Sequence, residues 1–337
     1  MAVKVGISGF GRISRVVIRA AVGDPDVDIV AINKRNANLE YMKYMLKYDS
    51  TFGRFPAELD IYEDGLVIDG KKIPVLSEGE AKDIPWADYG AEYIIEGTGA
   101  YLTAEKAMDH ITAGAKKVIM SAPAKDDTPT FVMGVNHDKY TSDMQIVSNA
   151  SCTTNCLAPM AKVIFDKFGI KQGLMATIHA STSKQHVVDS RSEKDWRTGR
   201  SVYGNIIPST TGAAKAVGLV IPELAGKMTG ISYRIPAADV SLVDLNVETE
   251  KATSIEEIRE AMKEAAEGSM KGILEFTDEE VTSIDFLADP HTSVFDSVQS
   301  LELSDHLFKI VGYYDNEFGY SNKLLELAKH MNKVDNE

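Results

Sequence analysis

An apolar strand, a glycine turn and an amphipathic helix follow one another in the N-terminal segment V-K-V-G-I-S-G-F-G-R-I-S-R-V-V-I-R-A. A second strand, V-D-I-V-A-I-N, comes after this helix and completes a strand-helix-strand unit. Gly9 and Gly11 would let a pyrophosphate approach the helix N-terminus closely. A glycine fingerprint indicates dinucleotide binding more strongly when it lies between a strand and a helix, as it does here. The segment therefore predicts a Rossmann dinucleotide-binding domain at the N-terminus.

The fingerprint departs from its usual form at two places. Ser14 stands where the third glycine is expected, and the second strand ends in Asn33, Lys34 and Arg35 without an acidic residue. A carboxylate there would bind the ribose hydroxyls and repel a 2'-phosphate, whereas Lys34 and Arg35 would attract that phosphate. Surface cations often only face solvent, which is the alternative. The cofactor is thus NAD or NADP, with Lys34 favouring NADP.

The remaining pattern predicts an α/β chain of two domains. A-E-Y-I-I-E-G-T-G-A and K-K-V-I-M-S-A-P read as further strands of the first sheet, and hairpin signals fall between Phe52 and Pro85. After residue 151 strands and helices no longer alternate, which favours an α+β catalytic domain with a mixed or antiparallel sheet. We expect an NAD(P)-binding domain at 1–151, completed by a C-terminal helical segment at 316–337, and a catalytic domain at 152–315.

Composition narrows the classes of function. Of 337 residues, 44% are hydrophobic and 26% are charged, as in globular proteins, and apolar runs are too short to span a bilayer. With no signal-peptide pattern, we expect a cytoplasmic protein without a membrane partner. The net charge of -14 argues against a nucleic-acid partner. The 2 cysteines lack zinc-ligand spacing, so no metal site is predicted.

The segment S-C-T-T-N-C carries the strongest chemical signal. A strand precedes it and a helical pattern follows, which places Cys152 near a helix N-terminus. The N–H groups there would favour a thiolate and could hold an oxyanion. His179, at the end of G-L-M-A-T-I-H, is the candidate base. The alternative is that both are ordinary buried residues, and Cys156, one turn further on, is interpreted as structural.

Several longer motifs occur in order along nearly the whole chain: G-F-G-R-I at 9–13, K-Y-D-S-T at 47–51, S-C-T-T-N-C at 151–156, S-T-T-G-A-A-K-A-V at 209–217 and Y-D-N-E-F-G-Y-S at 314–321. In these motifs the chain resembles the phosphorylating glyceraldehyde-3-phosphate dehydrogenases. The resemblance implies oxidation of D-glyceraldehyde 3-phosphate to 1,3-bisphosphoglycerate with reduction of NAD(P), in glycolysis or gluconeogenesis. It also implies a homotetramer.

The resemblance further implies roles for individual residues. Cys152 would attack the aldehyde, His179 would activate the thiol, and inorganic phosphate would release the acyl group from the thioester. The substrate phosphate would bind Thr182 and Arg234. The positions implied for inorganic phosphate are Ser151, Thr153, Thr211 and Gly212. The positions implied for the dinucleotide are Gly9, Gly11, Arg12, Ile13, Lys34, Ser121 and Asn316.

Four departures from the family pattern bear on specificity. Lys34 replaces an aspartate, Ser190 and Arg191 replace a glycine or leucine followed by proline, and Lys184 replaces a substrate-phosphate threonine. Gly79 also stands where an arginine is frequent near the adenine. An erythrose-4-phosphate dehydrogenase, which shares the motifs, and a non-catalytic binding relative therefore stay open as alternatives.

Overall fold

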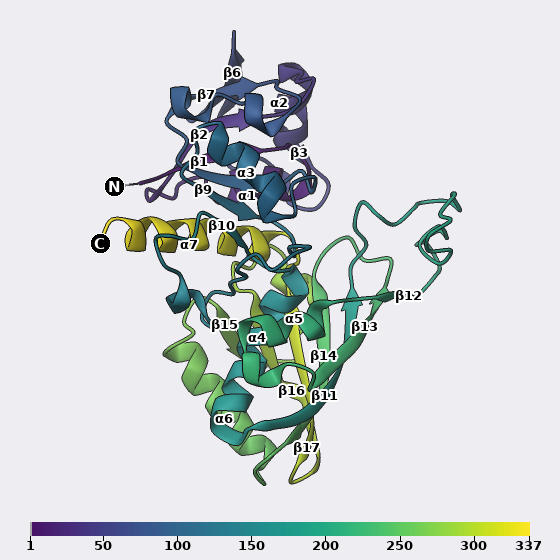
Figure 1. The fold of residues 1–337 in the computed structure, drawn as a ribbon. Coiled ribbons are helices and arrows are strands. Elements are labelled where there is room, and N and C mark those ends of the chain that lie inside the picture. Colours follow the sequence, from purple (N-terminus) through teal and green to yellow (C-terminus); the bar gives the residue numbers. More distant parts are fainter. Residues whose placement is uncertain (1) are drawn as a thin grey trace. The chain divides into compact units, whose positions relative to one another are not determined.

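The computed structural model describes residues 2–337, which divide into two compact units. Unit 1 runs to Met133 and also contains His137–Ser151 and Ser321–Glu337. Unit 2 contains Gly134–Asn136 and Cys152–Tyr320. Each unit is built around its own sheet (Figure 1).

Unit 1 has an eight-stranded sheet in the order β10-β9-β8-β1-β2-β7-β6-β5. The first six strands of that order pair in parallel, and the last two continue the sheet as antiparallel hairpins, as the sequence predicts. The strands are β1 (Val3–Ser8), β2 (Val27–Asn33), β5 (Leu59–Tyr62), β6 (Gly65–Ile68), β7 (Lys71–Leu76), β8 (Tyr93–Glu96), β9 (Lys117–Met120) and β10 (Ile146–Ser148).

Unit 1 also contains helices and short helical turns. They are α1 (Arg12–Ala20), α2 (Leu39–Lys47), α3 (Ala104–Thr112) and most of α7 (Phe318–Asp335), with short 3-10 turns at Ala81–Asp83, Trp86–Tyr89 and His137–Lys139. A small ribbon pairs β3 (Tyr48–Asp49) with β4 (Gly53–Arg54). The C-terminal end of α7 is tied to the unit because Asp335 accepts hydrogen bonds from the hydroxyls of Tyr93 (2.7 Å) and Tyr140 (2.8 Å).

Unit 2 has a seven-stranded mixed sheet in the order β12-β13-β11-β14-β17-β16-β15. The α+β domain with a mixed sheet that the sequence predicts is thereby confirmed. The strands are β11 (Ile170–His179), β12 (Ile207–Thr210), β13 (Met228–Arg234), β14 (Ser241–Thr249), β15 (Leu274–Thr277), β16 (Ser293–Ser304) and β17 (Leu307–Tyr314). The helices are α4 (Cys152–Phe168), α5 (Ala213–Val220) and α6 (Ile255–Glu267), with 3-10 turns at Pro222–Leu224 and Ser283–Phe286.

The two faces of the unit 2 sheet differ. Helices α4, α5 and α6 pack against strands on one face, and Met175 and His179 of β11 are buried. Other sheet residues stay exposed, among them Leu174, Ile231 and Leu301 at 63%, 44% and 53%. Asn246 and Lys309 lie between Leu174 and Leu301 across the sheet, so these exposed apolar side chains are interspersed with polar ones.

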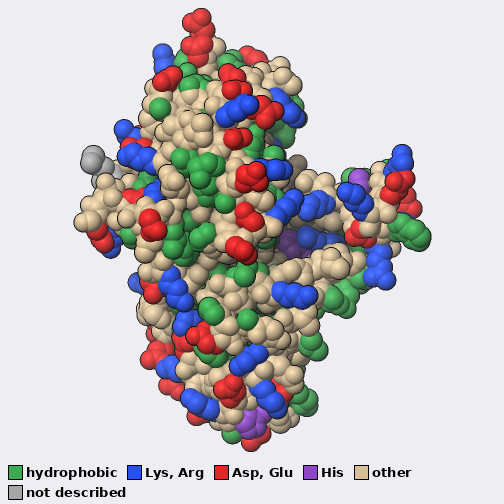
Figure 2. Space-filling view, viewed as in Figure 1, with side chains coloured by type: hydrophobic (Ala, Val, Ile, Leu, Met, Phe, Trp, Pro, Cys, Tyr) green, Lys and Arg blue, Asp and Glu red, His purple; other side chains and the backbone are tan. Residues whose placement is uncertain are grey.

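The surface carries both signs of charge. Figure 2 shows Lys and Arg interspersed with Asp and Glu on the visible face, although the chain as a whole has a net charge of -14. Among residues 2–337, no helix is both long enough and apolar enough to cross a bilayer.

Candidate active site

Cys152 is the first residue of α4, as the pattern around it predicts. The turn that leads to it is unusual, because Ala150 has a φ of 54° although it is not glycine. Residues other than glycine rarely adopt a left-handed conformation, and such strain is frequent at functional sites. The backbone thus turns sharply just before the thiol.

Strand pairing brings His179 and Arg234 together in unit 2. The parallel strands β11 and β13 place His179 directly beside Arg234, each at the C-terminal end of its strand. Nε2 of His179 lies 3.6 Å from Sγ of Cys152, and Nδ1 of the same ring lies 2.8 Å from Nη1 of Arg234. Thiol, imidazole and guanidinium therefore form one continuous chain.

The contacts of the His179 ring define how a proton can move. Nδ1 lies 2.8 Å from the carbonyl oxygen of Ala180, which Nη1 of Arg234 also approaches at 3.2 Å. When Nδ1 donates to that carbonyl, Nε2 presents a lone pair to the thiol and can act as a base. When Arg234 donates to Nδ1, Nε2 carries the hydrogen and can donate to a thiolate. The same ring can therefore both take the thiol proton and stabilise the product.

The pKa of Cys152 is raised, contrary to the lowering expected from the helix N-terminus. Burial raises the pKa of the thiol to about 11, although Arg234 and hydrogen bonds from Thr153 oppose this rise. Burial, together with Arg234, lowers the pKa of His179 to about 3. The desolvation of both groups outweighs the helix terminus, so at neutral pH the pair is a thiol beside a neutral imidazole.

Arg234 is partly buried and incompletely paired. Its Nε has no hydrogen-bond partner among residues 2–337, and burial lowers the pKa of the guanidinium. A buried donor without a partner is costly, and an anionic group on a substrate would satisfy it. This observation supports an anion at Arg234.

Tyr314 is a member of the site that the sequence did not single out. Its hydroxyl is shared by Oγ1 of Thr153 at 2.8 Å and Oγ1 of Thr177 at 2.9 Å, and its ring meets the His179 ring edge-on with centroids 5.9 Å apart. The hydroxyl of Thr153 thus faces the core of unit 2. Only the alternation of apolar residues in L-F-K-I-V-G-Y-Y could have indicated that Tyr314 faces inward.

The other residues implied for anion binding lie at loop and helix starts. Thr182 donates to Oε1 of Gln185 through its amide and hydroxyl, both at 3.0 Å. Thr211 accepts a hydrogen bond from the amide of Ala213, and Gly212 is the N-cap of α5. Ser151 directly precedes α4. Lys184 is exposed on the loop that follows β11.

Asn316 and Cys156 are fixed by neighbours within unit 2. Oδ1 of Asn316 accepts a hydrogen bond of 2.6 Å from Ser241, and Asn316 is 5% exposed. Cys156 is fully buried, with Ser293 donating to its backbone oxygen at 2.5 Å, and burial raises the pKa of its thiol. Its interpretation as a structural residue agrees with this environment.

Unit 1 contains a cavity of about 580 Å³ at the glycine turn. Gly9 and Gly11 form one wall, and Gly97 and Thr98, just after β8, form another. The remaining lining residues are Ser8, Phe10, Asn33, Lys34, Arg35, Glu78, Gly79, Glu80, Ala81, Ile84, Ala100 and Tyr101. The cavity lies at the carboxyl ends of parallel strands, where such sheets bind dinucleotides.

The glycines and the start of α1 fit a pyrophosphate. Gly9 has a φ of 96°, and a side chain there would meet Thr98 at 2.9 Å. Gly11 is the N-cap of α1, whose first residues are Arg12 and Ile13, so backbone N–H groups of this turn face the cavity side of the sheet. The Arg12 guanidinium is paired with Asp49, so an anion would meet the backbone of Arg12 and not its charge.

The residues expected to select the adenosine end also lie at this cavity. Lys34 and Arg35 line it, and Nζ of Lys34 donates to the carbonyl oxygens of Arg35 (2.9 Å) and Asn36 (3.3 Å). Gly79 leaves open space, since a Cβ added there would meet no atom within 4 Å beyond its chain neighbours. Ser121, beyond β9, donates its hydroxyl to the carbonyl oxygen of Glu96 at 2.8 Å.

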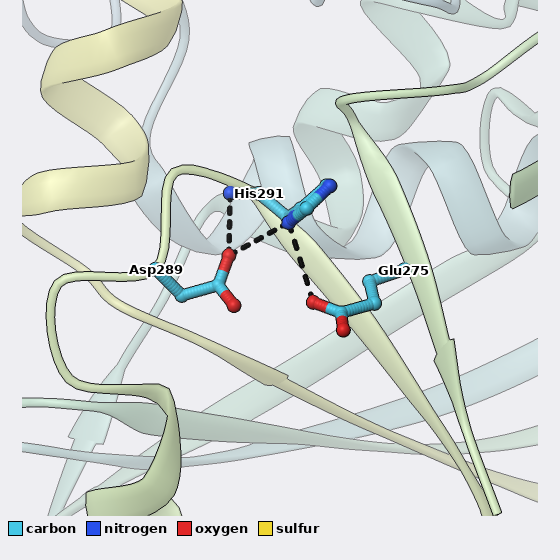
Figure 3. Close-up of side chains that lie close together, drawn as sticks. All are labelled: Glu275, Asp289 and His291. Atoms are coloured by element: carbon cyan, nitrogen blue, oxygen red, sulfur yellow. Dashed lines mark hydrogen bonds and ion pairs between the residues drawn. The ribbon is translucent and has the colours of Figure 1, made fainter.

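Among residues 2–337, one group of side chains has metal-ligand character: Glu275, Asp289 and His291 (Figure 3). Nδ1 of His291 lies 2.8 Å from Asp289 and 3.3 Å from Glu275. Burial and the neighbouring Asp289 raise the pKa of Glu275. Contacts among the three side chains satisfy one another without an ion, and the absence of a metal site stays a prediction.

In comparisons with known proteins, a segment of each unit matches a family model. Residues 3–104 match the family model described as glyceraldehyde 3-phosphate dehydrogenase, NAD binding domain, and residues 151–316 match the C-terminal domain of the same family. The chain is 55% identical over 333 residues to glyceraldehyde-3-phosphate dehydrogenase A of Escherichia coli K12, covering 99% of this chain and 100% of that protein. It is 53% identical over 335 residues to glyceraldehyde-3-phosphate dehydrogenase 2 of Mucor circinelloides, covering 99% of each.

Both family models and both relatives, which align over nearly their full length, indicate the same family. The chain belongs to the glyceraldehyde-3-phosphate dehydrogenase family.

Proposed function

We propose that this protein oxidises D-glyceraldehyde 3-phosphate in the presence of inorganic phosphate, forming 1,3-bisphosphoglycerate and reducing NAD(P). One observation carries the proposal: Nε2 of His179 lies 3.6 Å from Sγ of Cys152 at the start of α4, with Arg234 on the other side of the ring. A nucleophile, a base and a cation in this order suit capture of an anionic aldehyde.

The chain's own residues account for the covalent steps. Sγ of Cys152 attacks the aldehyde carbon while the thiol proton passes to Nε2 of His179, and His179 passes this proton on to the carbonyl oxygen to give a thiohemiacetal. The nicotinamide of a bound dinucleotide would supply the hydride acceptor, and His179, again neutral, would accept the proton of the hydroxyl group. A phosphate oxygen attacks the resulting thioester, which releases the acyl phosphate and returns the Cys152 thiolate.

We assign the substrate phosphate and inorganic phosphate to two different sites. We assign the substrate phosphate to Arg234 and Thr182, since the buried Nε of Arg234 lacks a partner among residues 2–337. We assign inorganic phosphate to Ser151, Thr153, Thr211 and Gly212. The engaged hydroxyl of Thr153 favours a contact through its backbone N–H at the start of α4.

Cofactor binding falls to residues 1–151 together with 316–337, and thiol chemistry to residues 152–315. We assign Gly9, Gly11, Arg12 and Ile13 to the pyrophosphate, Asn316 to the nicotinamide amide, Lys34 to the adenosine half, and Ser121 to a cofactor contact at a strand end. Lys34 and Arg35 both line the cavity of unit 1, which supports a preference for NADP through its 2'-phosphate.

We further propose a homotetramer that works in the cytoplasm. The exposed apolar residues of the unit 2 sheet, Leu174, Ile231 and Leu301, supply a surface that a second copy could cover. Cys152 must stay reduced to act as a nucleophile, which a reducing compartment favours. Light scattering after size exclusion tests the tetramer, and a monomer at micromolar concentration would contradict it.

Initial rates test the reaction and its specificity together. Glyceraldehyde 3-phosphate and erythrose 4-phosphate are compared at saturating phosphate, with NAD and NADP titrated separately and Cys152→Ser as the blank. We expect higher kcat/KM for glyceraldehyde 3-phosphate and for NADP. A preference for erythrose 4-phosphate would replace the substrate, a preference for NAD would reject the role of Lys34, and the absence of turnover would make the protein a binding relative.

A further inference from the structure

Three buried side chains form a hydrogen-bonded chain beneath the cavity of unit 1. Nε1 of Trp86 lies 3.1 Å from Nδ1 of His110, and Nε2 of His110 lies 3.1 Å from Oε2 of Glu96. Each of the three residues is 0% exposed. A histidine and a carboxylate seldom lie so deep without a structural or functional reason. We refer to Trp86, His110 and Glu96 as the buried relay.

The hydrogen bonds of the relay determine which ring nitrogen of His110 carries the proton. The indole N–H of Trp86 can only donate, so Nδ1 of His110 must accept. The remaining proton therefore lies on Nε2, which donates to Glu96. A neutral His110 in one tautomer thus holds one oxygen of the Glu96 carboxylate.

The other oxygen of Glu96 holds a wall of the cofactor cavity. Oε1 accepts hydrogen bonds from the amide of Thr98, at 2.7 Å, and from its hydroxyl. Thr98 lies in the cavity lining, and its methyl carbon would be 2.9 Å from a Cβ at Gly9. The carboxylate thus sets the distance between the Thr98 wall and the glycine turn.

His110 also supports a second part of the lining. The ring of Tyr101 meets the His110 ring edge-on, with centroids 5.2 Å apart, and its hydroxyl accepts a hydrogen bond of 2.9 Å from the amide of Ala81. Tyr101 and Ala81 both line the cavity. The buried imidazole of His110 therefore contacts Tyr101 directly and supports Thr98 through Glu96, and both residues line the cavity.

We propose that the buried relay of Trp86, His110 and Glu96 is a positioning device for dinucleotide affinity, and that its residues touch neither cofactor nor substrate. The relay holds Thr98 and Tyr101 at the separation that the dinucleotide needs. This inference rests on the proposed function only in taking the cavity as the NAD(P) site. Because the relay lies in unit 1, it acts on dinucleotide binding and leaves the thiol chemistry of unit 2 unchanged.

The test uses variants that remove one or both hydrogen bonds of the relay with little change in shape. Trp86→Phe removes the N–H that determines the tautomer of His110. His110→Leu removes the hydrogen bonds of the imidazole with both Trp86 and Glu96. His110→Gln is the conservative replacement, since its amide can still accept from Trp86 and donate to Glu96. Tyr89→Phe, in the same 3-10 turn as Trp86 but outside the lining, is the matched control.

Calorimetric titration with NAD and NADP, and steady-state kinetics with glyceraldehyde 3-phosphate, give the readouts. We expect Trp86→Phe and His110→Leu to raise both the Kd and the KM for dinucleotide about tenfold, with kcat within about twofold, because each leaves a buried polar group unpaired. His110→Gln should recover most of the affinity. An unchanged Kd in variants that melt cooperatively, or a fall in kcat at constant KM, would overturn the proposal.

Three further outcomes can be told apart by experiment. If the relay variants fail to fold, Thr98→Val, at an exposed position, must still weaken dinucleotide binding several-fold by losing its hydroxyl contact with Glu96, and an unchanged Kd there overturns the proposal. A parent protein that binds dinucleotide without oxidising glyceraldehyde 3-phosphate refutes the proposed reaction and not the relay. A parent protein that binds neither NAD nor NADP refutes both.

Discussion

The hydroxyl of Tyr314 offers a quantitative test of how unit 2 supports the thiol. Tyr314, Thr153 and Thr177 are 1%, 4% and 1% exposed, and the tyrosine hydroxyl is shared by both threonines. Tyr314→Phe keeps the ring against His179 but leaves two threonine hydroxyls without this partner. A buried polar group that loses its partner costs about 1–3 kcal/mol.

We therefore expect Tyr314→Phe to lower the free energy of unfolding by about 2–4 kcal/mol. For a domain of this size each kcal/mol lowers Tm by about 2–4 °C, so a fall of about 4–16 °C should appear in thermal scans at a fixed rate. Thr153 also hydrogen-bonds the Cys152 thiol, so Thr177 has the hydroxyl that is left unpaired. Adding Thr177→Val should therefore restore about 1–2 kcal/mol, which a double-mutant cycle would show as a coupling energy.

The control is Tyr203→Phe, because Tyr203 is 68% exposed and should change Tm by less than about 1 °C. Activity of Tyr314→Phe well below its Tm should persist, since the His179 contacts with Cys152 and Arg234 do not involve the hydroxyl. A Tm equal to that of the parent, or additive effects of Tyr314→Phe and Thr177→Val, would refute the reasoning from buried hydroxyls.

Three further substitutions test separate parts of the account. Lys34→Asp should raise the KM for NADP about tenfold or more and lower that for NAD, as one charge-assisted contact is exchanged for repulsion; equal KM values before and after would exclude Lys34 from the site. Arg234→Leu should raise the pKa of Cys152 further, because Arg234 opposes the effect of burial, so iodoacetamide should alkylate the thiol more slowly at pH 8, and unchanged rates would contradict this. Burial, followed by the charge of Asp315, raises the pKa of Asp239 to about 9, so the folded protein keeps a proton that the unfolded chain releases near about pH 4. The stability that this proton provides is complete below about pH 4 and is lost as pH rises through about 9, so Asp239→Asn should lose less stability in urea between pH 7 and 9 than the parent, and identical losses would disprove the assignment.

Much of the fold could be predicted from local sequence patterns. The strand-turn-helix at Gly9 and the strand Y-I-I-E, which forms β8, were predictable because parallel strands read as continuous apolar runs. The capping box at Ser254 and Glu257 likewise marked the start of α6. The start of α4 at Cys152 followed from the change in periodicity after the polar turn.

Contacts between distant residues were not predictable from one sequence. The pKa of Cys152 depends on how deeply unit 2 buries it, and the helix N-terminus that the sequence indicates has the smaller effect. Glu96 and His110 are fourteen positions apart, on a strand end and a helix, and no local periodicity links them. Tyr314 is separated by 161 positions from Thr153, so only the folded sheet brings their hydroxyls together.

The central claim is that Cys152 carries the acyl group between oxidation and phosphate attack. The most direct measurement is a rapid-mixing experiment with glyceraldehyde 3-phosphate and excess NAD(P) without phosphate, followed by peptide mass analysis. The account predicts a burst of about one reduced dinucleotide per Cys152, an acyl adduct on the peptide that contains Cys152, and steady turnover only when phosphate is added. Turnover at the same rate without phosphate, or a burst with no adduct on that peptide, would contradict it.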